Sequence, residues 1–473
     1  MTTEAYPWSA GFRSLEEEHD YRIEEVDGQV PPWLRGTLLH NGSGRNAIGG
    51  RWFAHWFDGD GMIAAVRFGD DGMHFRNRYV ATDNYRDETR AGRVVNRGFG
   101  NMRPGGVLAN AFRLPANVSN TSVVMDGDRL LSLWEGGPPY ALDPATLETR
   151  GVEDFGGKVK AFSAHPKRDP DTGELFNFGV DYGAKCTLTP YRLHNGDLTA
   201  LPAVTLPYAV MNHDFVLTRN HLVFCIGPIL QSPLAFLLGL KSFDGGLHWE
   251  GGKPTLILLV PRAGGPPRII ETDAFFQFHF ANGYEEEGAL VIDLMRYPDY
   301  LTVGEAVRSF WSSEWPAEGM ATLTRLTVDL AGGKVTSRAW SDGRGDTGHA
   351  NEFPFINPAR VGKRHRYAYF LSNPADRPRG LQQRLCKLDC ETGAATHHAF
   401  GPHGYPGEPC FIAAPNGAED EGVVVALVFD ASRERTDVVG LDARDVAGKP
   451  LFVGRLKHHV PFMLHGAFTP RRY

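Results

Sequence analysis

The 473-residue sequence lacks the features that mark several large classes of protein. No apolar run reaches the roughly 18 to 20 residues that span a bilayer. Residues 1–8 lack the basic segment and apolar core of a signal peptide. Lys and Arg number 49 against 56 Asp and Glu, so the net charge is −7, and no basic stripe for nucleic acid is present. These absences predict a cytoplasmic protein without a nucleic-acid partner.

Cysteine and the common catalytic motifs are also scarce. The five cysteines are too few and odd in number for a disulfide framework, so we expect reduced thiols. There is no Walker loop, no Gly-x-Gly-x-x-Gly opening a helix after a strand, and no His-Glu-x-x-His. The run that begins at Gly42 is not the Gly-x-Ser-x-Gly of a hydrolase nucleophile. Hydrolase chemistry therefore has no local support.

Turn residues and short strand-like runs dominate what is present. There are 55 Gly and 32 Pro, which favour a turn-rich fold over long helices. A phrase of strand, acidic turn and strand recurs at Asp143, Asp329, Asp389 and Asp442, and the last two copies stand 53 residues apart (389 to 442). That period is typical of four-stranded blades and predicts an all-β propeller of about seven blades. A β-sandwich of ordinary hairpins is the alternative. No linker or composition break divides residues 1–473, so we expect a single domain.

Histidine supplies the candidates for chemistry. Four of the 18 histidines, His165, His213, His279 and His465, lie in apolar or turn-bound contexts. Each alone is typical of a buried core histidine, and their spacing is not that of a zinc finger. In a propeller, however, the inner strands of different blades converge on the axis and could bring all four around one metal ion. An all-imidazole shell suits Fe, Cu, Zn or Ni better than Mg or Ca.

Neutral imidazole ligands need carboxylates nearby to accept their other N–H groups. Glu135, Glu352 and Glu408 are the candidates, because each stands beside Gly or Pro or in an apolar strand. Exposed turn glutamates are the alternative interpretation of the same three residues.

Taken together, these motifs resemble the carotenoid cleavage oxygenase family over nearly the whole chain. The matching segments are residues 32–38, 41–44, 57–62, 120–122, 133–137, 163–166, 212–215, 278–282, 351–354, 407–409 and 464–466. The resemblance implies a seven-bladed propeller with one Fe(II) on its axis, under a dome of loops and short helices. It implies that the four histidines are the iron ligands and that the three glutamates hold them. It also implies a substrate pocket lined by Phe57, Trp134, Phe278 and Phe280.

The implied reaction is the oxidative cleavage of a carbon–carbon double bond by dioxygen at a ferrous centre, without a reductant or organic cofactor. In the phenolic branch of the family, which takes phenylpropanoid or stilbene alkenes, a Lys precedes the first glutamate and a Tyr lies upstream. Here Trp134 stands at the Lys position, and an apolar ring suits a polyene better than a phenolate. We therefore expect an apocarotenoid substrate, with a phenolic alkene as the alternative. Phe280 follows the third histidine, where many members have His or Ala, and is expected to reshape the pocket.

Two further hypotheses stay open. A retinoid isomerase of the same family would share the four histidines but consume no oxygen. A propeller used only as a binding platform would have purely structural histidines.

The apolar segment from Leu230 to Leu240 is too short to span a membrane. It is either a buried core segment or an exposed patch that contacts lipid or collects an apolar substrate. The family resemblance implies a place near the tunnel mouth, so we expect peripheral contact with a membrane there.

Overall fold

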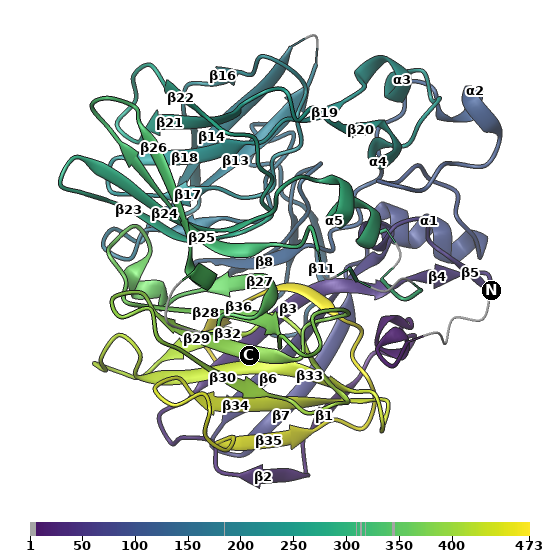
Figure 1. Cartoon of the computed structure of the whole chain (residues 1–473). Coiled ribbons are helices and arrows are strands. Elements are labelled where there is room, and N and C mark those ends of the chain that lie inside the picture. The colour runs from purple at the N-terminus through teal and green to yellow at the C-terminus, as the bar shows by residue number, and fades with distance from the viewer. Residues whose placement is uncertain (1–5, 184, 309, 313–314, 317, 343–345) are drawn as a thin grey trace.

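The computed structural model describes residues 6–183, 185–308, 310–312, 315–316, 318–342 and 346–473. Seven β-sheets of four to six strands are arranged as blades around one axis (Figure 1). The predicted all-β, seven-bladed propeller is therefore confirmed.

The blades are numbered here in chain order, and the strands of each run from the axis outward. Blade 1 contains β36 (Met463–Thr469), β3 (Gly36–Arg45), β6 (Asp60–Gly69), β7 (Gly72–Tyr79) and β1 (Asp20–Arg22). Blade 2 contains β8 (Ser122–Asp126), β9 (Arg129–Leu133), β10 (Tyr140–Leu142) and β11 (Thr149–Val152). Blade 3 contains β12 (Lys167–Arg168), β13 (Leu175–Tyr182), β14 (Cys186–His194) and β15 (Asp197–Ala200), with β16 (Val204–Thr205) also paired to β14.

The other four blades repeat this plan. Blade 4 contains β17 (Val216–Leu217), β18 (His221–Ile226), β21 (Thr255–Pro261) and β22 (Arg268–Thr272). Blade 5 contains β23 (Phe280–Glu286), β24 (Ala289–Arg296), β25 (Thr322–Asp329) and β26 (Val335–Ala339). Blade 6 contains β27 (His349–Phe355), β28 (Tyr367–Asn373), β29 (Arg384–Asp389) and β30 (Ala395–Ala399). In blade 7, β31 (Gly404–Pro406) and β32 (Cys410–Ala413) both pair with β33 (Gly422–Asp430), followed by β34 (Arg435–Asp442), β35 (Phe452–Arg455) and β2 (Val26–Gly28).

The recurring acidic phrase forms the turn between the third and the fourth strand of a blade. In blade 2, Asp143 Oδ1 accepts hydrogen bonds from the backbone N–H groups of Ala145 and Thr146 at 2.9 and 3.0 Å. In blade 6, Asp389 Oδ1 accepts from the N–H groups of Glu391 and Thr392 at 2.9 and 3.3 Å. An aspartate that caps its own turn in this way explains why the phrase recurs, in blades 2, 5, 6 and 7.

Segments from the two ends of the chain close the ring. In blade 1 the last strand, β36, pairs antiparallel with β3, with Asn41 opposite His465. In blade 7 the early strand β2 pairs with β35, with Val26 opposite Gly454. Figure 1 shows this as purple strands beside yellow ones in the lower half of the molecule. Because β36 is the innermost strand of its blade, ring closure also carries His465 to the axis.

Helices and small sheets gather outside the blades, on the right of Figure 1. They are α1 (Asp83–Ala91), α2 (Gly106–Asn110), α3 (Pro233–Leu237), α4 (Phe243–Gly246) and α5 (Leu301–Ala306), with the pairs β4 (Ala47–Ile48) and β5 (Arg51–Trp52), and β19 (Ile229–Gln231) and β20 (Leu247–Trp249). A cluster of buried aromatic side chains that includes Trp56, Phe310 and Trp315 fills this region. No helix among the described residues is long and apolar enough to cross a membrane.

Removing residues 463–473 should abolish cooperative unfolding, because β3 would lose its inner partner and the ring would stay open. Thermal unfolding followed by circular dichroism tests this expectation. A variant that lacks only residues 470–473, which follow β36, is the control and should unfold cooperatively. A cooperative transition at the full-length temperature in the longer deletion would show that β36 is dispensable.

Candidate metal centre

Every blade contributes one polar residue to the same end of the axis, at or near the start of its innermost strand. In blade order these residues are His465, Thr121, His165, His213, His279, Glu352 and Glu408. Innermost strands of different blades contact one another, for example β36 with β8 and β23 with β27. The topology therefore brings together residues that are far apart in the sequence.

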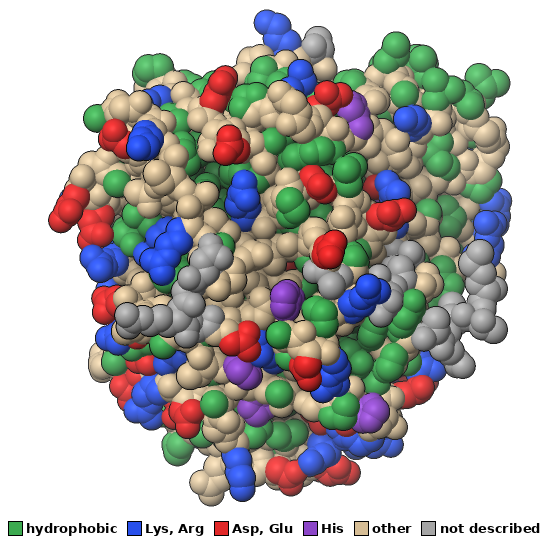
Figure 2. All heavy atoms as spheres, viewed as in Figure 1, with side chains coloured by type: hydrophobic (Ala, Val, Ile, Leu, Met, Phe, Trp, Pro, Cys, Tyr) green, Lys and Arg blue, Asp and Glu red, His purple; other side chains and the backbone are tan. Residues whose placement is uncertain are grey.

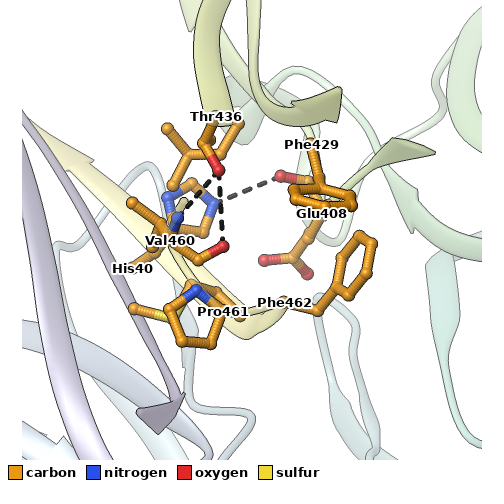
Figure 3. A pocket seen from close by; sticks show the side chains of 10 residues that line it. His40, Glu408, Phe429, Thr436, Val460, Pro461 and Phe462 are labelled. Carbon is orange, nitrogen blue, oxygen red and sulfur yellow. Dashed lines mark hydrogen bonds between the residues drawn. The ribbon is translucent and has the colours of Figure 1, made fainter. Parts of the chain in front are cut away.

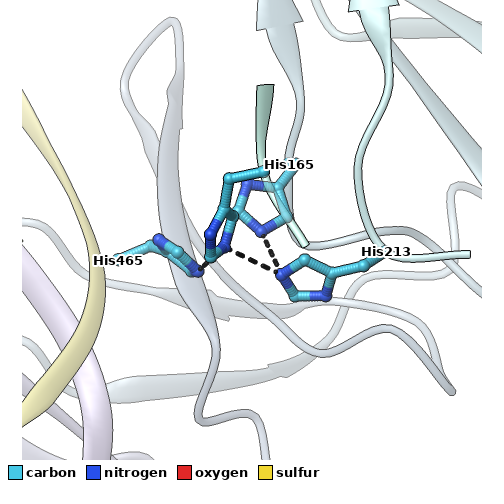
Figure 4. A group of neighbouring side chains, drawn as sticks. His165, His213 and His465 are labelled. Carbon is cyan, nitrogen blue, oxygen red and sulfur yellow. Dashed lines mark hydrogen bonds between the residues drawn. The ribbon is translucent and has the colours of Figure 1, made fainter. Parts of the chain in front are cut away.

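The four predicted histidines meet with their Nε2 atoms facing one another. The His165 and His213 Nε2 atoms are 2.8 Å apart, and those of His213 and His279 are 3.1 Å apart. The His279 and His465 Nε2 atoms are 3.3 Å apart. Figure 4 shows His165, His213 and His465 pointing into one shared space. The histidines thus form a metal-binding group.

The three predicted glutamates contact the opposite nitrogen, Nδ1, of three of these rings. Glu352 Oε2 lies 2.5 Å from His279 Nδ1, and Glu408 Oε1 lies 2.7 Å from His465 Nδ1. Glu135 Oε1 contacts His213 Nδ1. A carboxylate at Nδ1 fixes the proton on that nitrogen and leaves Nε2 free for a metal.

Burial and mutual repulsion favour the neutral form of His165 and His279, whereas the pKa of His213 shifts in the opposite direction. Burial, together with the neighbouring histidines, holds the pKa of His165 and His279 well below the ordinary value. Burial also lowers the pKa of His213, but the charge and hydrogen bond of Glu135 outweigh it and raise the pKa overall. Burial raises the pKa of Glu352 to about 7, so a negative charge there needs a positive partner.

The spacing of the nitrogens fits a single ion. Two nitrogens at about 2.1 Å from one ion lie about 3.0 Å apart at a right angle and about 3.4 Å apart at a tetrahedral angle. The observed separations of 2.8, 3.1 and 3.3 Å are close to these values, so one ion placed between the nitrogens would lie within bonding distance of them.

A small cavity of about 10 Å³ lies behind Glu408 (Figure 3). His40 lines it, and the His40 Nε2–H group donates to the backbone carbonyl of Glu408 at 3.2 Å. Glu408 Oε2 accepts from the Gly466 N–H group at 2.8 Å. These bonds hold both the backbone and the side chain of Glu408 in place beside His465.

A cavity of about 830 Å³ leads to the histidines. Its lining includes His213, His279 and His465 at one end and many apolar or aromatic side chains elsewhere. Of the four predicted substrate-contacting residues, Phe57, Trp134 and Phe278 line this cavity. Phe278 also packs edge-on against the His213 ring, with centroids 5.4 Å apart.

The prediction that Phe280 shapes the pocket is wrong. Phe280 packs into the apolar core between blades 4 and 5, with Val216 and Leu294, and is not among the described residues that line the cavity. Phe280 begins β23, and successive side chains of an extended strand point to opposite faces. Since His279 points to the axis, the side chain that follows it points into the blade interface.

The structure also adds cavity residues that the sequence analysis missed. Thr121 lines the cavity, and its carbonyl oxygen accepts from the His465 N–H group at 3.1 Å. Tyr297 lines it too, and its hydroxyl donates to Glu352 Oε1 at 2.5 Å. Thr121 could have been found from the sequence, because it stands at the start of an inner strand. Nothing in the sequence around Tyr297 marks it as a cavity residue.

The segment from Leu230 to Leu240 exposes several of its leucines, which excludes the buried-core interpretation, although Gln231, Phe236 and Gly239 within it are buried. Leu234 is 69% exposed, and it faces solvent together with Leu237, Leu238 and Leu240. The loop around α2 lies alongside, because the Phe112 N–H group donates to the Leu237 carbonyl at 2.7 Å. We call the exposed apolar residues of these two segments the apolar patch: Met102, Val107, Leu108, Phe112, Leu114, Leu234, Leu237, Leu238 and Leu240.

The apolar patch surrounds a mouth of the cavity. Leu114, Leu234 and Leu237 belong to the patch and also line the cavity. In Figure 2 hydrophobic side chains gather at the upper right, over the α2 and α3 region of Figure 1. The cavity therefore connects an exposed apolar surface with the four histidines.

A second group of metal-compatible residues, Asp293, His365 and Cys390, is buried between blades 5 and 6. Arg325 occupies both oxygens of Asp293, at 3.0 and 2.7 Å. The Asn282 amide donates to His365 Nδ1 at 3.1 Å, so the ring proton sits on Nε2, which faces Asp293 at 3.2 Å. A protonated nitrogen and a carboxylate already paired with arginine cannot bind a metal, so this group is a structural ion-pair network.

Comparison with known proteins identifies the class. The family model "Retinal pigment epithelial membrane protein" (RPE65) matches residues 12–470. The chain is 36% identical to the apocarotenoid-15,15'-oxygenase of Synechocystis sp. over 98% of this chain and 96% of that protein. It is 29% identical to the isoeugenol monooxygenase of Pseudomonas nitroreducens over 94% of both. The crystal structure of cobalt-substituted Synechocystis ACO superposes with a TM-score of 0.91 at 36% identity, covering 98% of both chains.

The fold, the four histidines and these relatives define a metal-dependent oxygenase class. The chain belongs to the RPE65 (carotenoid oxygenase) family, as its motifs predict.

Phe280→Ala should lower the free energy of unfolding by about 3–5 kcal/mol, because it empties a buried aromatic site between two blades. Metal content should not change, since the side chain points away from the histidines. Denaturant unfolding and elemental analysis of the same preparation test both statements. Phe280→Leu, which leaves a smaller cavity, should cost less; an altered metal content in either variant would contradict this placement.

Proposed function

We propose that this protein is a non-haem Fe(II) dioxygenase that cleaves a carbon–carbon double bond of an apocarotenoid to carbonyl products. The observation that carries the proposal is the meeting of four Nε2 atoms at the end of an apolar cavity of about 830 Å³. A neutral imidazole set suits Fe(II) among the candidate metals, and three carboxylates balance its charge. One iron per chain would be held by His165, His213, His279 and His465.

The residues of the chain would act by holding the metal and the substrate and by orienting the imidazole rings. When bound, ferrous iron supplies the redox chemistry that activates dioxygen. The apolar walls near Phe57, Trp134 and Phe278 would hold the polyene in line and exclude water. Glu135, Glu352 and Glu408 would keep the protons on Nδ1 and orient the rings, and they would not act as general acids or bases.

The polar residues of the cavity favour a polyene over a phenol. Among the described residues that line it, the lysine present is Lys160, which is paired with Asp181 at 3.2 Å. The Tyr182 hydroxyl donates a hydrogen bond to the Val210 carbonyl at 2.8 Å, and the Tyr297 hydroxyl donates one to the Glu352 carboxylate. Among the described lining residues, a phenolate would therefore find no buried lysine, and both tyrosine hydroxyls already donate to other groups. The higher identity to the Synechocystis enzyme supports the same choice, at 36% against 29% for isoeugenol monooxygenase.

The function can be tested with ferrous-reconstituted protein in mild detergent under air. An apocarotenal should yield shortened polyene aldehydes by mass spectrometry, with oxygen uptake, whereas isoeugenol in a parallel sample should yield none. His279→Ala is the control and should lose both iron and turnover. Vanillin alone would assign the protein to the phenolic branch, and conversion without oxygen uptake would support an isomerase. An inert iron-loaded protein would contradict catalysis of either alkene.

Peripheral contact with a lipid surface is the second part of the proposal. The apolar patch lies around the cavity mouth, and Leu108 at its edge is 91% exposed. Burying such side chains in a lipid surface is favourable and would let an apolar substrate enter without crossing water.

Leu108→Glu combined with Leu234→Glu should reduce co-sedimentation with liposomes by at least about tenfold, because each leucine loses about 1.5 kcal/mol or more of transfer energy. Ile269→Glu is the matched control, since Ile269 is 50% exposed on β22, outside the patch. Equal liposome binding by the double variant and the wild type would refute membrane contact by the patch.

A further inference from the structure

One buried carboxylate, that of Asp214, joins the segments that carry two neighbouring histidines. Asp214 directly follows His213, and its side chain is 1% exposed. Its Oδ2 accepts a hydrogen bond at 3.1 Å from the backbone N–H group of Phe280, the residue that follows His279. The chain on which His279 stands is thereby tied to the chain on which His213 stands.

The other oxygen of the same carboxylate extends this link to a third histidine. Asp214 Oδ1 lies 2.8 Å from Nζ of Lys167, two residues after His165. The same oxygen accepts from the Phe215 N–H group at 2.7 Å, which fixes the direction of the side chain. Asp214 therefore contacts residues one or two positions beyond three of the four histidines, in blades 3, 4 and 5.

His165 differs from the other three histidines in how its ring is held. The other three histidines are each held at Nδ1 by a glutamate, whereas no carboxylate contacts the His165 ring among the described residues. The backbone of His165 is held through Ser163, whose Oγ accepts from the His165 N–H group at 3.3 Å and donates to the His213 carbonyl at 3.1 Å. The Lys167–Asp214 pair adds a charged contact to this neutral one.

We propose that Asp214 is a positioning residue that sets the spacing of His165, His213 and His279 for the metal. The inference rests on the metal centre of the proposed function. Both carboxylate oxygens accept from donors, and the Lys167 ammonium balances the buried charge. An asparagine of the same shape could accept through one atom only and would turn its NH₂ group toward either Lys167 or the Phe280 N–H group.

Asp214→Asn should therefore weaken metal binding without removing any ligand. Losing a group that orients ligands typically costs about 10- to 100-fold in metal affinity, and we expect a loss in that range. Cobalt(II) is the probe: metal-free protein is titrated, and the visible absorption bands report both affinity and coordination geometry. We expect a raised Kd and a changed band intensity in Asp214→Asn.

Three further variants separate positioning from general stability. Asp293→Asn is the matched control, because Asp293 is also a buried aspartate paired with a basic residue, Arg325. The other side-chain partners of Asp293 are His365 and Trp340, which are not among the four histidines or the residues that adjoin them. It should lower the melting temperature and leave the cobalt Kd and spectrum unchanged. If Asp214→Asn does not fold, Lys167→Met takes its place and should raise the Kd, whereas Lys167→Gln, which keeps a donor, should retain more of the affinity.

The outcomes distinguish this inference from the proposed function. A wild type that binds cobalt, with an unchanged Kd and spectrum in Asp214→Asn or in Lys167→Met, would overturn the positioning role alone. A wild type that binds no cobalt would overturn the metal centre and this inference with it.

Discussion

Pairing of buried charge is the constraint on which the rest of this structure depends. Three glutamates and four imidazoles share one end of the propeller axis, and neutral imidazoles carry no charge to balance the carboxylates. Burying negative charge without a positive partner is costly, which is visible in the raised pKa of Glu352. A divalent cation bound by the four Nε2 atoms would remove that cost. Metal binding at this site would therefore also stabilise the fold.

The propeller satisfies this constraint through its topology. Each inner strand brings one polar side chain to the axis, and the second and later strands build apolar interfaces between blades. Because β36 closes blade 1, His465 reaches the other histidines only when the two ends of the chain are joined. Folding of the ring and assembly of the metal centre are therefore linked events.

Much of this architecture could be predicted from the sequence, since its causes are local. Asp143 and Asp389 cap their own turns, and this chemistry is visible as a repeated phrase. The roles of the histidines and glutamates follow only from the family resemblance that their motifs carry together, because each residue alone is also typical of a core histidine or a turn glutamate. Phe280 was assigned wrongly because its direction depends on strand alternation relative to His279 and not on its size or type. Tyr297 was missed because its role arises from a contact with Glu352, 55 residues away, that only folding creates.

The two ends of the cavity bury charges of opposite sign. At the axis, carboxylates lie around the four histidines, whereas at the mouth the positively charged Arg97 side chain is buried. Arg97 has no carboxylate partner among the described residues; its guanidinium donates to the carbonyls of Asn110 and Arg113 at 3.1 and 2.8 Å and to that of Phe236 at 2.9 Å. These acceptors lie at the ends of α2 and α3 or just beyond, where unpaired carbonyls and the helix dipoles favour positive charge. One buried side chain thus fastens both halves of the apolar patch at the mouth of the cavity.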